Sequence, residues 1–264
     1  MSNGRFYHLD ERDQLQEMEM TGAPVIPISA EEFLNALDTR PANKKLDLSR
    51  RWVSDLDLSG KDLSNIDFSC TRFERVDFDG ANMDGCDVKR CFFVDSSFHN
   101  VSLTNSDAEE ASFRGIDLRG SDFSGTDFYS AGLEYSNMEG IITDEKTKWL
   151  GDGVPKTGAF LAWKIGGNGR VIEMLVPAEA KRTCSTTEAG RCEYAKVLTI
   201  TSVDFSETYE WETALVDDDF LYEKGKMVYP ANGFDPYPWM SDAAGIHFFT
   251  DRDMAISFGT GYYK

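Results

Sequence analysis

Residues 61–90, KDLSN IDFSC TRFER VDFDG ANMDG CDVKR, place a large apolar residue third in every group of five. The same period runs from about residue 46 to residue 140, with the small Ala108 at one such position. The large apolar positions are Leu48, Val53, Leu58, Leu63, Phe68, Phe73, Phe78, Met83, Val88, Phe93, Phe98, Leu103, Phe113, Leu118, Phe123, Phe128, Leu133 and Met138.

A period of five fits neither the helix, which repeats every 3.6 residues, nor the strand, which repeats every 2. It suits a chain that turns a corner every five residues, so that four groups close into a coil. A second, mostly small residue two positions earlier, such as Ile66 or Ala81, then also points inward. Glycine at the last position of many groups suits corners with positive φ. Arg51 and Lys61 occupy such small positions, which predicts an irregular, solvent-open first coil.

This pattern resembles the pentapeptide-repeat family, whose motif is a small residue, Asp or Asn, Leu or Phe, and two polar residues. The resemblance implies a mainly β fold, a right-handed quadrilateral β-helix of about five coils. The coils would stack about 4.8 Å apart, as hydrogen-bonded strands do. We expect Ala108 to thin the core locally, between Val88 and Phe128.

The flanking sequences predict two further parts. Residues 1–45 break the period, and the Ser29 to Glu32 capping box predicts a short helix over about 29–39 that caps the first coil. Residues 141–264 read as a C-terminal α+β domain. Strands are expected in AFLAWKI, GRVIEML, AKVLTITSV, ETYEWETAL, FLYEKGKMVYP and GIHFFT, with a helix in DRDMAISF capped by Thr250 or Asp251. This part is similar to an uncharacterised domain that follows pentapeptide repeats in bacteriophage and giant-virus proteins.

The charge limits the partners. Forty-six Asp and Glu against 27 Lys and Arg give a formal net charge of −19 and a pI near 4.5. Such a chain is repelled by nucleic acid and by anionic membranes, and it suits a partner with a basic surface. The charged N-terminus lacks an apolar signal core, no run is long enough for a membrane span, and the five cysteines are odd in number. These features favour free thiols and a cytoplasmic location, the host cytoplasm if the protein is phage-encoded.

Residues twenty apart should stack on one face of the coil. One face then carries an aspartate in every coil, namely Asp47, Asp67, Asp87, Asp107 and Asp127. Residues 47–140 hold 19 acidic and 9 basic residues, a net charge of −10. Two interpretations stay open: the carboxylates bond nearby backbone N–H groups at the corners, or they form an ordered negative surface that a basic partner binds.

A second face breaks the rule with Trp52, Arg72 and Phe92, residue types that are enriched at protein interfaces. It is a candidate interface, for a homodimer among others. Packing of the N-terminal segment or the C-terminal domain onto this face explains the same residues.

The sequence carries no strong sign of an enzyme. The histidines are His8, His99 and His247, and no nucleophile elbow, phosphate loop or HExxH motif is present. Asp217, Asp218 and Asp219 with Glu223 read as a solvated loop rather than a divalent-ion site. GIHFFTDRDMAISF loosely resembles a strand and helix of ADP-ribosyltransferase-like folds, which would bring Arg182, Tyr222 and His247 to a nucleotide.

The sequence therefore predicts a non-enzymatic, acidic protein-binding module of phage type, without cofactor or metal. In its most specific form it is a DNA-mimic-like inhibitor of a host nucleic-acid or defence enzyme, an activity that some pentapeptide-repeat proteins are thought to have. The alternatives are a structural virion or assembly scaffold protein, and an ADP-ribosyltransferase-like nucleotide-binding C-terminal domain.

Overall fold

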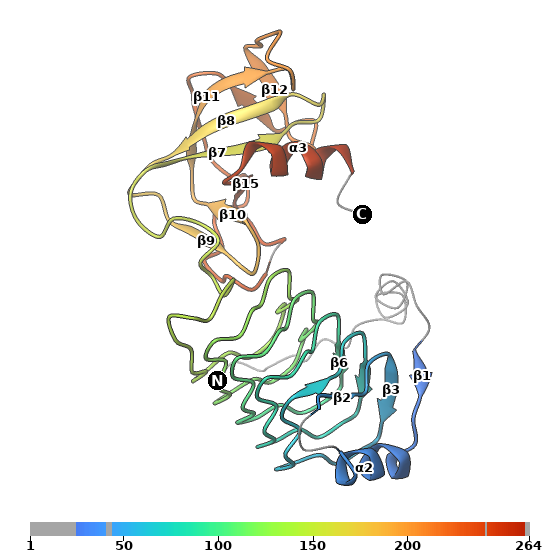
Figure 1. Ribbon diagram of the computed structural model, residues 1–264. Coiled ribbons are helices and arrows are strands. Elements are labelled where there is room, and N and C mark those ends of the chain that lie inside the picture. Colours follow the sequence, from blue (N-terminus) through green and yellow to red (C-terminus); the bar gives the residue numbers. More distant parts are fainter. Residues whose placement is uncertain (1–24, 41–43, 241, 262–264) are drawn as a thin grey trace. The chain divides into compact units, whose positions relative to one another are not determined.

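The computed structural model describes residues 25–40, 44–240 and 242–261. It divides into two compact units at the step from Leu150 to Gly151, the repeat unit and the C-terminal unit (Figure 1). His8 lies outside the described residues. No helix in the described part of the chain is long and apolar enough to cross a membrane.

The repeat unit is a stack of coils in which residues twenty apart pair in parallel (Figure 1). One wall is a four-stranded sheet in the order β1 (Ile26–Pro27), β3 (Arg51–Ser54), β5 (Arg72–Glu74) and β6 (Phe92–Val94). A second wall holds the pair β2 (Leu46–Asp47) and β4 (Ile66–Asp67), continued by single bridges. Strand pairing along the stack confirms a mainly β, repeat-type β-helix.

The corners explain the period of five. Every fifth residue from Arg50 to Gly140 has a positive φ, whether or not it is glycine. Many corners are hydrogen-bonded β-turns, as where the N–H of Thr71 donates to the carbonyl of Phe68 at 2.9 Å, whereas the corners that follow β3, β5 and β6 are bends. The positive φ falls on the second central residue, as in a type II turn, which is why glycine and asparagine are frequent there.

The interior of the coils is filled as the period predicts. The rings of Phe73, Phe93 and Phe113 stack in consecutive coils at 5.3 and 4.9 Å between centroids. Ala108 is also fully buried. Of the two basic departures, Lys61 is exposed and Arg51 is partly exposed, in line with an irregular first coil.

The small inward positions carry a buried polar ladder. Ser121 Oγ donates to the carbonyl of Phe98 at 2.8 Å and accepts from the N–H of Val101 at 3.1 Å, one coil earlier. Thiols do the same at Cys86 and Cys91, which donate to the carbonyls of Leu63 and Phe68. Burial raises the pKa of the Cys86 thiol to about 12 and that of Cys91 well above its usual range. All five cysteines are free.

A helix covers the N-terminal end of the stack. Helix α2 (Ala30–Asp38) has the expected capping box, with Glu32 N–H donating to Ser29 Oγ and Ser29 N–H to Glu32 Oε2. Its Phe33 is fully buried and stacks on Phe68 at 6.3 Å between centroids.

At the other end, pairing continues beyond residue 140. Ile142 pairs with Asp122, and Lys148 pairs with Asp127, a separation of 21 that admits one extra residue. The Asp144 to Thr147 turn holds that extra residue, with Thr147 N–H donating to Asp144 Oδ1. The extra residue ends the apolar period, and the coil itself goes on.

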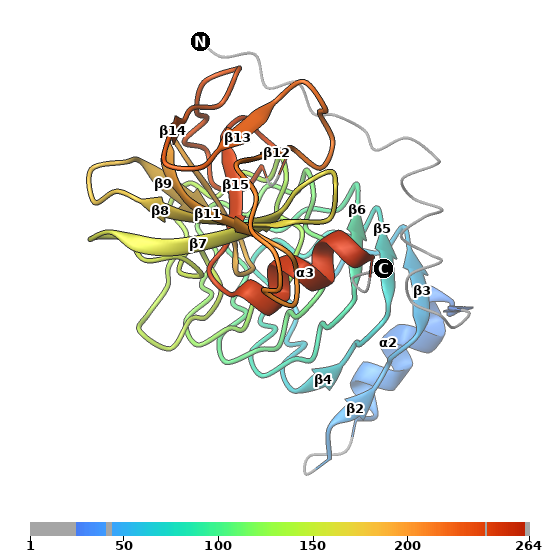
Figure 2. The same ribbon diagram turned by 90° about the horizontal axis from the view of Figure 1, so that it is seen from above.

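The C-terminal unit contains a seven-stranded sheet (Figure 2). Its order is β14 (Met227–Val228), β11 (Ala195–Thr201), β8 (Val171–Val176), β7 (Phe160–Ile165), β15 (Ile246–Phe249), β10 (Ala189–Cys192) and β9 (Arg182–Cys184). The neighbouring strands pair antiparallel. A separate two-stranded ribbon is made by β12 (Trp211–Thr213) and β13 (Leu221–Glu223).

Alternation along the strands directs one face of this sheet into a core that includes Ala162, Ile172, Met174 and Phe248. Helix α3 (Arg252–Thr260) begins at the N-cap Asp251, whose side chain accepts from the N–H of Met254. It packs against β7 closely enough that a Cβ on Gly259 would collide with the side chain of Ile165. The expected segments all contain strand or helix, and β9 and β10 are additional.

Candidate acidic interface

The predicted aspartate column exists as one continuous parallel register. Asp47 pairs with Asp67 in β2 and β4, and single bridges join Asp67 to Asp87, Asp87 to Asp107 and Asp107 to Asp127. Asp47 is exposed and the other four are partly exposed. The column therefore presents one carboxylate per coil, about 4.8 Å apart.

Each carboxylate of the column is also bonded to its own corner. The Oδ1 atoms of Asp47, Asp67 and Asp87 accept from the N–H two residues later at 3.0, 2.9 and 3.1 Å. Asp107 and Asp127 do the same at 3.2 Å. Hydrogen bonds from the side chain and backbone of Ser49 lower the pKa of Asp47. The backbone role anticipated for Asp at corners is thus present, and it fixes the direction of every carboxylate.

Lysine side chains form ion pairs with three of the five column aspartates. Lys89 Nζ lies 3.2 Å from Asp87 and 3.1 Å from Asp107, and Lys148 Nζ lies 3.2 Å from Asp127. Among residues 25–40, 44–240 and 242–261, no ion pair is found for Asp47 or Asp67. Within the described residues, the column aspartates that lack a paired cation are therefore those of the first two coils.

A further acidic surface lies on the two other walls. One column joins Asp57 to Asp77 and Ser97, and another joins Asp62, Asn82, Ser102 and Asp122. Asp79 and Asp84 flank these columns and accept from the N–H groups of His99 and Thr104 in the following coil. Arg40 pairs with Asp62 across the start of the stack.

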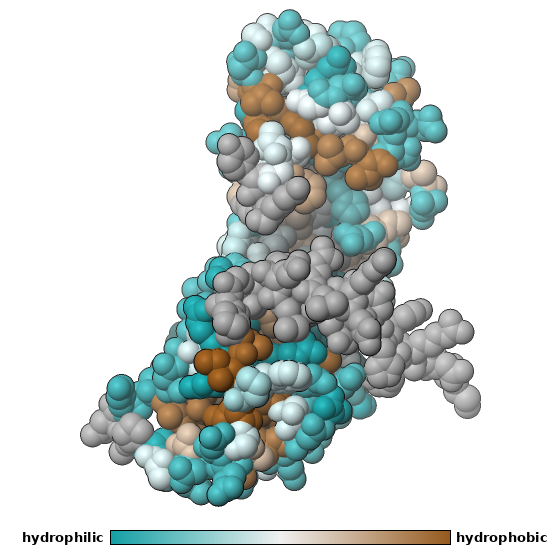
Figure 3. Space-filling view, turned by 90° about the vertical axis from the view of Figure 1, so that its right-hand side faces the viewer, coloured by the Kyte–Doolittle hydropathy of each residue, from teal (hydrophilic) through white to brown (hydrophobic). Residues whose placement is uncertain are grey.

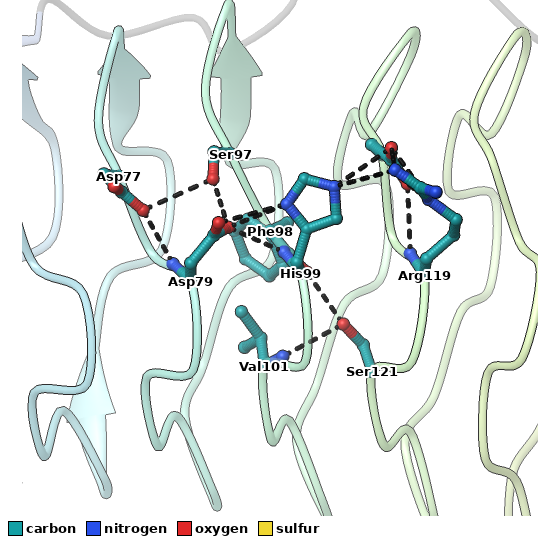
Figure 4. Close-up of polar contacts among 9 residues, drawn as sticks. Asp77, Asp79, Ser97, Phe98, His99, Val101, Arg119 and Ser121 are labelled. Atoms are coloured by element: carbon teal, nitrogen blue, oxygen red, sulfur yellow. Dashed lines mark hydrogen bonds and ion pairs between the residues drawn. The ribbon is translucent and has the colours of Figure 1, made fainter.

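His99 sits within this surface, between carboxylates of the coils on either side (Figure 4). Its Nδ1 lies 3.1 Å from both oxygens of Asp79, and its Nε2 lies 3.0 Å from Asp117 Oδ2. Arg119 donates to Asp117 at 2.7 Å. Hydrogen bonds to Asp117 and Asp79 raise the pKa of His99 against the opposing effect of burial. The sequence marked His99 only as outward-facing, although a separation of twenty places it over Asp79.

The irregular face is also in register. Trp52, Arg72 and Phe92 pair across β3, β5 and β6, and Figure 3 shows apolar side chains among hydrophilic ones on the side where β1 and β3 lie. Trp52 is 39% exposed, whereas Arg72 and Phe92 are 6% and 8% exposed. Arg72 Nε lies 3.3 Å from Glu74 Oε2, and its buried NH1 atom has no hydrogen-bond partner among the described residues.

In a comparison with protein families, the family model described as the pentapeptide repeat region matches residues 55–142. Those residues form a pentapeptide-repeat domain. A second model, of a family of unknown function (DUF5758), matches residues 152–255 of the C-terminal unit. Comparison with curated proteins finds no match.

Several solved structures resemble the pentapeptide-repeat domain at low identity. The pentapeptide repeat protein Rfr23 of the cyanobacterium Cyanothece 51142 is 16% identical, with a TM-score of 0.31 over 52% of this chain and 98% of that chain. The pentapeptide repeat protein alr5209 of Nostoc Pcc 7120 is 16% identical, with a TM-score of 0.25 over 46% and 100% of the two chains. Full-length QnrB1, a plasmid-mediated fluoroquinolone resistance protein, is 16% identical, with a TM-score of 0.23 over 40% and 71%.

The three residues considered for a nucleotide site each have a polar partner within the C-terminal unit. The Arg182 guanidinium donates to the carbonyls of Pro177, Ala178, Gly158 and Ala180. Tyr222 accepts from Lys164, and His247 Nε2 lies 2.9 Å from the carbonyl of Ala243. Only Arg182 of the three lines the cavity of about 260 Å³ beside Cys184 and Trp239.

The acidic loop behaves as a turn. The N–H of Asp219 donates to Asp217 Oδ1 at 3.0 Å. Within the described residues no group of His, Cys, Asp and Glu has the arrangement of a metal site.

Proposed function

We propose that the pentapeptide-repeat domain is a non-enzymatic protein-binding module whose aspartate column binds a basic surface of a partner. The observation that carries this proposal is the unbroken register from Asp47 to Asp127, with one carboxylate in each coil. Because each Oδ1 is bonded to its corner, the column keeps its geometry without a partner, and binding costs little ordering of these side chains.

The charge pattern supports a cationic partner. Aspartates about one coil apart repel each other by roughly 1 kcal/mol in water, and a partner's Lys or Arg side chains relieve that repulsion. Lys89 and Lys148 already do so for the last three aspartates, so the contact should be strongest at Asp47 and Asp67. Long-range attraction would raise the association rate and make it salt-dependent.

The specific form of the proposal is a DNA-mimic-like inhibitor of a host nucleic-acid or defence enzyme, encoded by a phage. A rigid rod with regularly spaced negative charge can occupy a groove that normally holds phosphates. The likeness of the C-terminal unit to domains of phage and giant-virus proteins supports a host protein as the target.

The test is a variant with all five column aspartates changed to Asn. Asn keeps an Oδ1 acceptor, so the corner hydrogen bonds survive while the charge is lost. The control is a variant of the neighbouring columns, D57N, D62N and D122N. We expect binding to a basic DNA-handling protein, found by screening a panel of host enzymes, to weaken about a hundredfold in the column variant at low salt. The column variant removes five charges and the control three, so equal loss per charge removed would assign the effect to net charge. Unchanged affinity of the column variant would overturn the proposal.

A further inference from the structure

The β12–β13 ribbon exposes apolar side chains that the core does not use. Glu212 and Tyr222 face each other across the ribbon and are buried. By alternation Trp211 and Leu221 lie on the opposite face, where they are 50% and 51% exposed. The connecting loop adds Leu215, 39% exposed, and Val216, 95% exposed. Four large apolar side chains in so short a segment exceed the scattered exposure that is normal for a surface.

The buried side of the ribbon holds it firmly against the sheet. Glu212 Oε1 accepts from Asn168 Nδ2 at 2.7 Å and from the N–H of Thr213 at 2.7 Å. A Cβ on Gly166 would collide with the Glu212 side chain, so only glycine permits this approach. Lys164 Nζ donates to Tyr222 OH at 2.7 Å. These contacts fix the ribbon before any partner arrives, which lowers the entropic cost of binding.

Beside exposed Trp211 lie two partly buried side chains, Arg170, which is 3.7 Å from the buried Glu212 carboxylate, and Tyr209, which packs against the core. The Arg170 guanidinium lies 3.8 Å from the centroid of the Tyr209 ring and 5.8 Å from that of Trp211. Arg170 NH1 also donates to the Trp211 carbonyl at 3.3 Å. Trp, Tyr and Arg are the residues most often found as interface hot spots.

Acidic side chains surround this apolar surface. Asp217, Asp218 and Asp219 are exposed in the loop, and exposed Glu223 lies opposite Trp211 across the ribbon. The cations nearby are exposed Lys224, which lies 3.4 Å from Glu210, exposed Lys226, and partly buried Arg170, which lies 3.7 Å from Glu212. A second copy of the chain would bring its own acidic loop against this one, so like charges disfavour self-association here.

We propose that the outer face of the β12–β13 ribbon and its loop form a docking surface for a basic, amphipathic segment of a partner protein. Trp211, Leu215, Val216 and Leu221 would receive apolar side chains, and Asp217 to Asp219 would pair with Lys or Arg at the rim. This surface lies outside the pentapeptide-repeat domain and does not depend on the function proposed for the aspartate column.

The test uses the full-length protein and two synthetic peptides as probes. One is an amphipathic helix of Leu and Lys, and the other is the same peptide with every Lys replaced by Glu. Titration calorimetry should show saturable binding of the Leu–Lys peptide and none of the Leu–Glu peptide. The W211S/L221S variant should weaken binding about tenfold or more, and D217N/D218N/D219N should weaken it several-fold at low salt. The matched control is V203S, which removes an apolar side chain 42% exposed in the same unit and should leave affinity unchanged.

Three outcomes would overturn the proposal. The first is equal loss in V203S and W211S/L221S, and the second is loss confined to the five-aspartate variant of the column, which would place the peptide on the repeat. The third is a concentration-dependent dimer in analytical ultracentrifugation that W211S/L221S abolishes, which would make a second copy the occupant.

Discussion

The Nδ1 atom of His99 lies 3.1 Å from both carboxylate oxygens of Asp79, which stands one coil earlier. The other ring nitrogen faces Asp117, and Arg119 lies alongside that carboxylate. Burial raises the pKa of Asp79, but hydrogen bonds from Ser97 and His99 outweigh it and the net pKa is lowered. The pKa of Asp117 is likewise lowered, by Arg119 and His99 against burial. The His99 ring thus lies between two carboxylates and joins three coils.

This cluster predicts a stability that falls at alkaline pH. The pKa of His99 is raised in the folded protein, so its stabilising effect is complete below about pH 6.5 and is lost as pH rises through the raised value. The carboxylates act in the opposite direction, and their contribution is lost as pH falls below about 3.9. We expect a loss of about 1 kcal/mol or less on the alkaline side, since the imidazole is partly solvated. Hydrogen exchange of the coil amides at pH 6 and pH 9 measures this loss of stability. The H99Q variant should show no such loss between the two pH values. An equal loss in H99Q and in the parent would contradict the prediction.

Glycine is favoured at the corner of residue 85 for two reasons. Gly85 has a φ of +68°, and an added Cβ would lie 2.7 Å from Asn65 Oδ1 in the coil below. Gly60 has a φ of +62° with nothing within 4 Å of its Cβ position. We expect G60A to cost about 1 kcal/mol through φ alone and G85A to cost about 0.5 kcal/mol more, because the Asn65 side chain must move aside. Denaturant unfolding measures the free energy of unfolding of each variant. N65A/G85A, compared with N65A, should lose only as much as G60A loses. Equal costs for G60A and G85A would rule out an effect of the close approach to Asn65.

The buried polar ladder predicts a larger effect at Ser121 than at neighbouring serines. S121A would leave the Val101 N–H and the Phe98 carbonyl without their partner inside the coil. An unsatisfied buried group costs about 1–3 kcal/mol, and this should appear in the unfolding free energy. Ser124 lies on the outer surface of the same coil, so S124A is the control and should change stability by less than about 0.5 kcal/mol. S121T keeps the hydroxyl and should recover much of the loss.

The repeat could be predicted from sequence because one physical rule governs all of it. A corner every five residues fixes which side chains point inward, and a period of twenty places Asp47 over Asp67 and Trp52 beside Arg72. The same rule could not show that Lys89 reaches two aspartates of different coils, because side-chain direction is not set by the period. The period also could not show the two pairings beyond residue 140, at Ile142 and Lys148, since one extra residue before Lys148 ends the periodic pattern.

The C-terminal unit was harder because its contacts join distant segments. Lys164 and Tyr222 lie 58 residues apart, and no local pattern links them. The short strand Arg182–Cys184 has no alternation of apolar and polar residues, and the strand Ala189–Cys192 contains glycine, so neither resembled a strand. The cluster of Trp211, Leu215, Val216 and Leu221 becomes visible only when burial shows which apolar residues the core leaves out.

A dependence of stability on pH is also expected from Lys164, which lies on the core-facing side of β7. Burial lowers the pKa of its ammonium to about 8, and the Tyr222 hydroxyl is the partner of Nζ at 2.7 Å. Because the unfolded chain holds this proton more tightly, stability should rise with pH between about 8 and 10.5. The K164M variant should lose this rise of stability with pH. Reductive methylation at pH 8, followed by peptide mass mapping, should modify Lys164 faster than Lys226, an exposed lysine of the same unit. Equal rates, together with a stability that does not change between pH 8 and 10.5, would show that the Lys164 ammonium keeps its ordinary pKa.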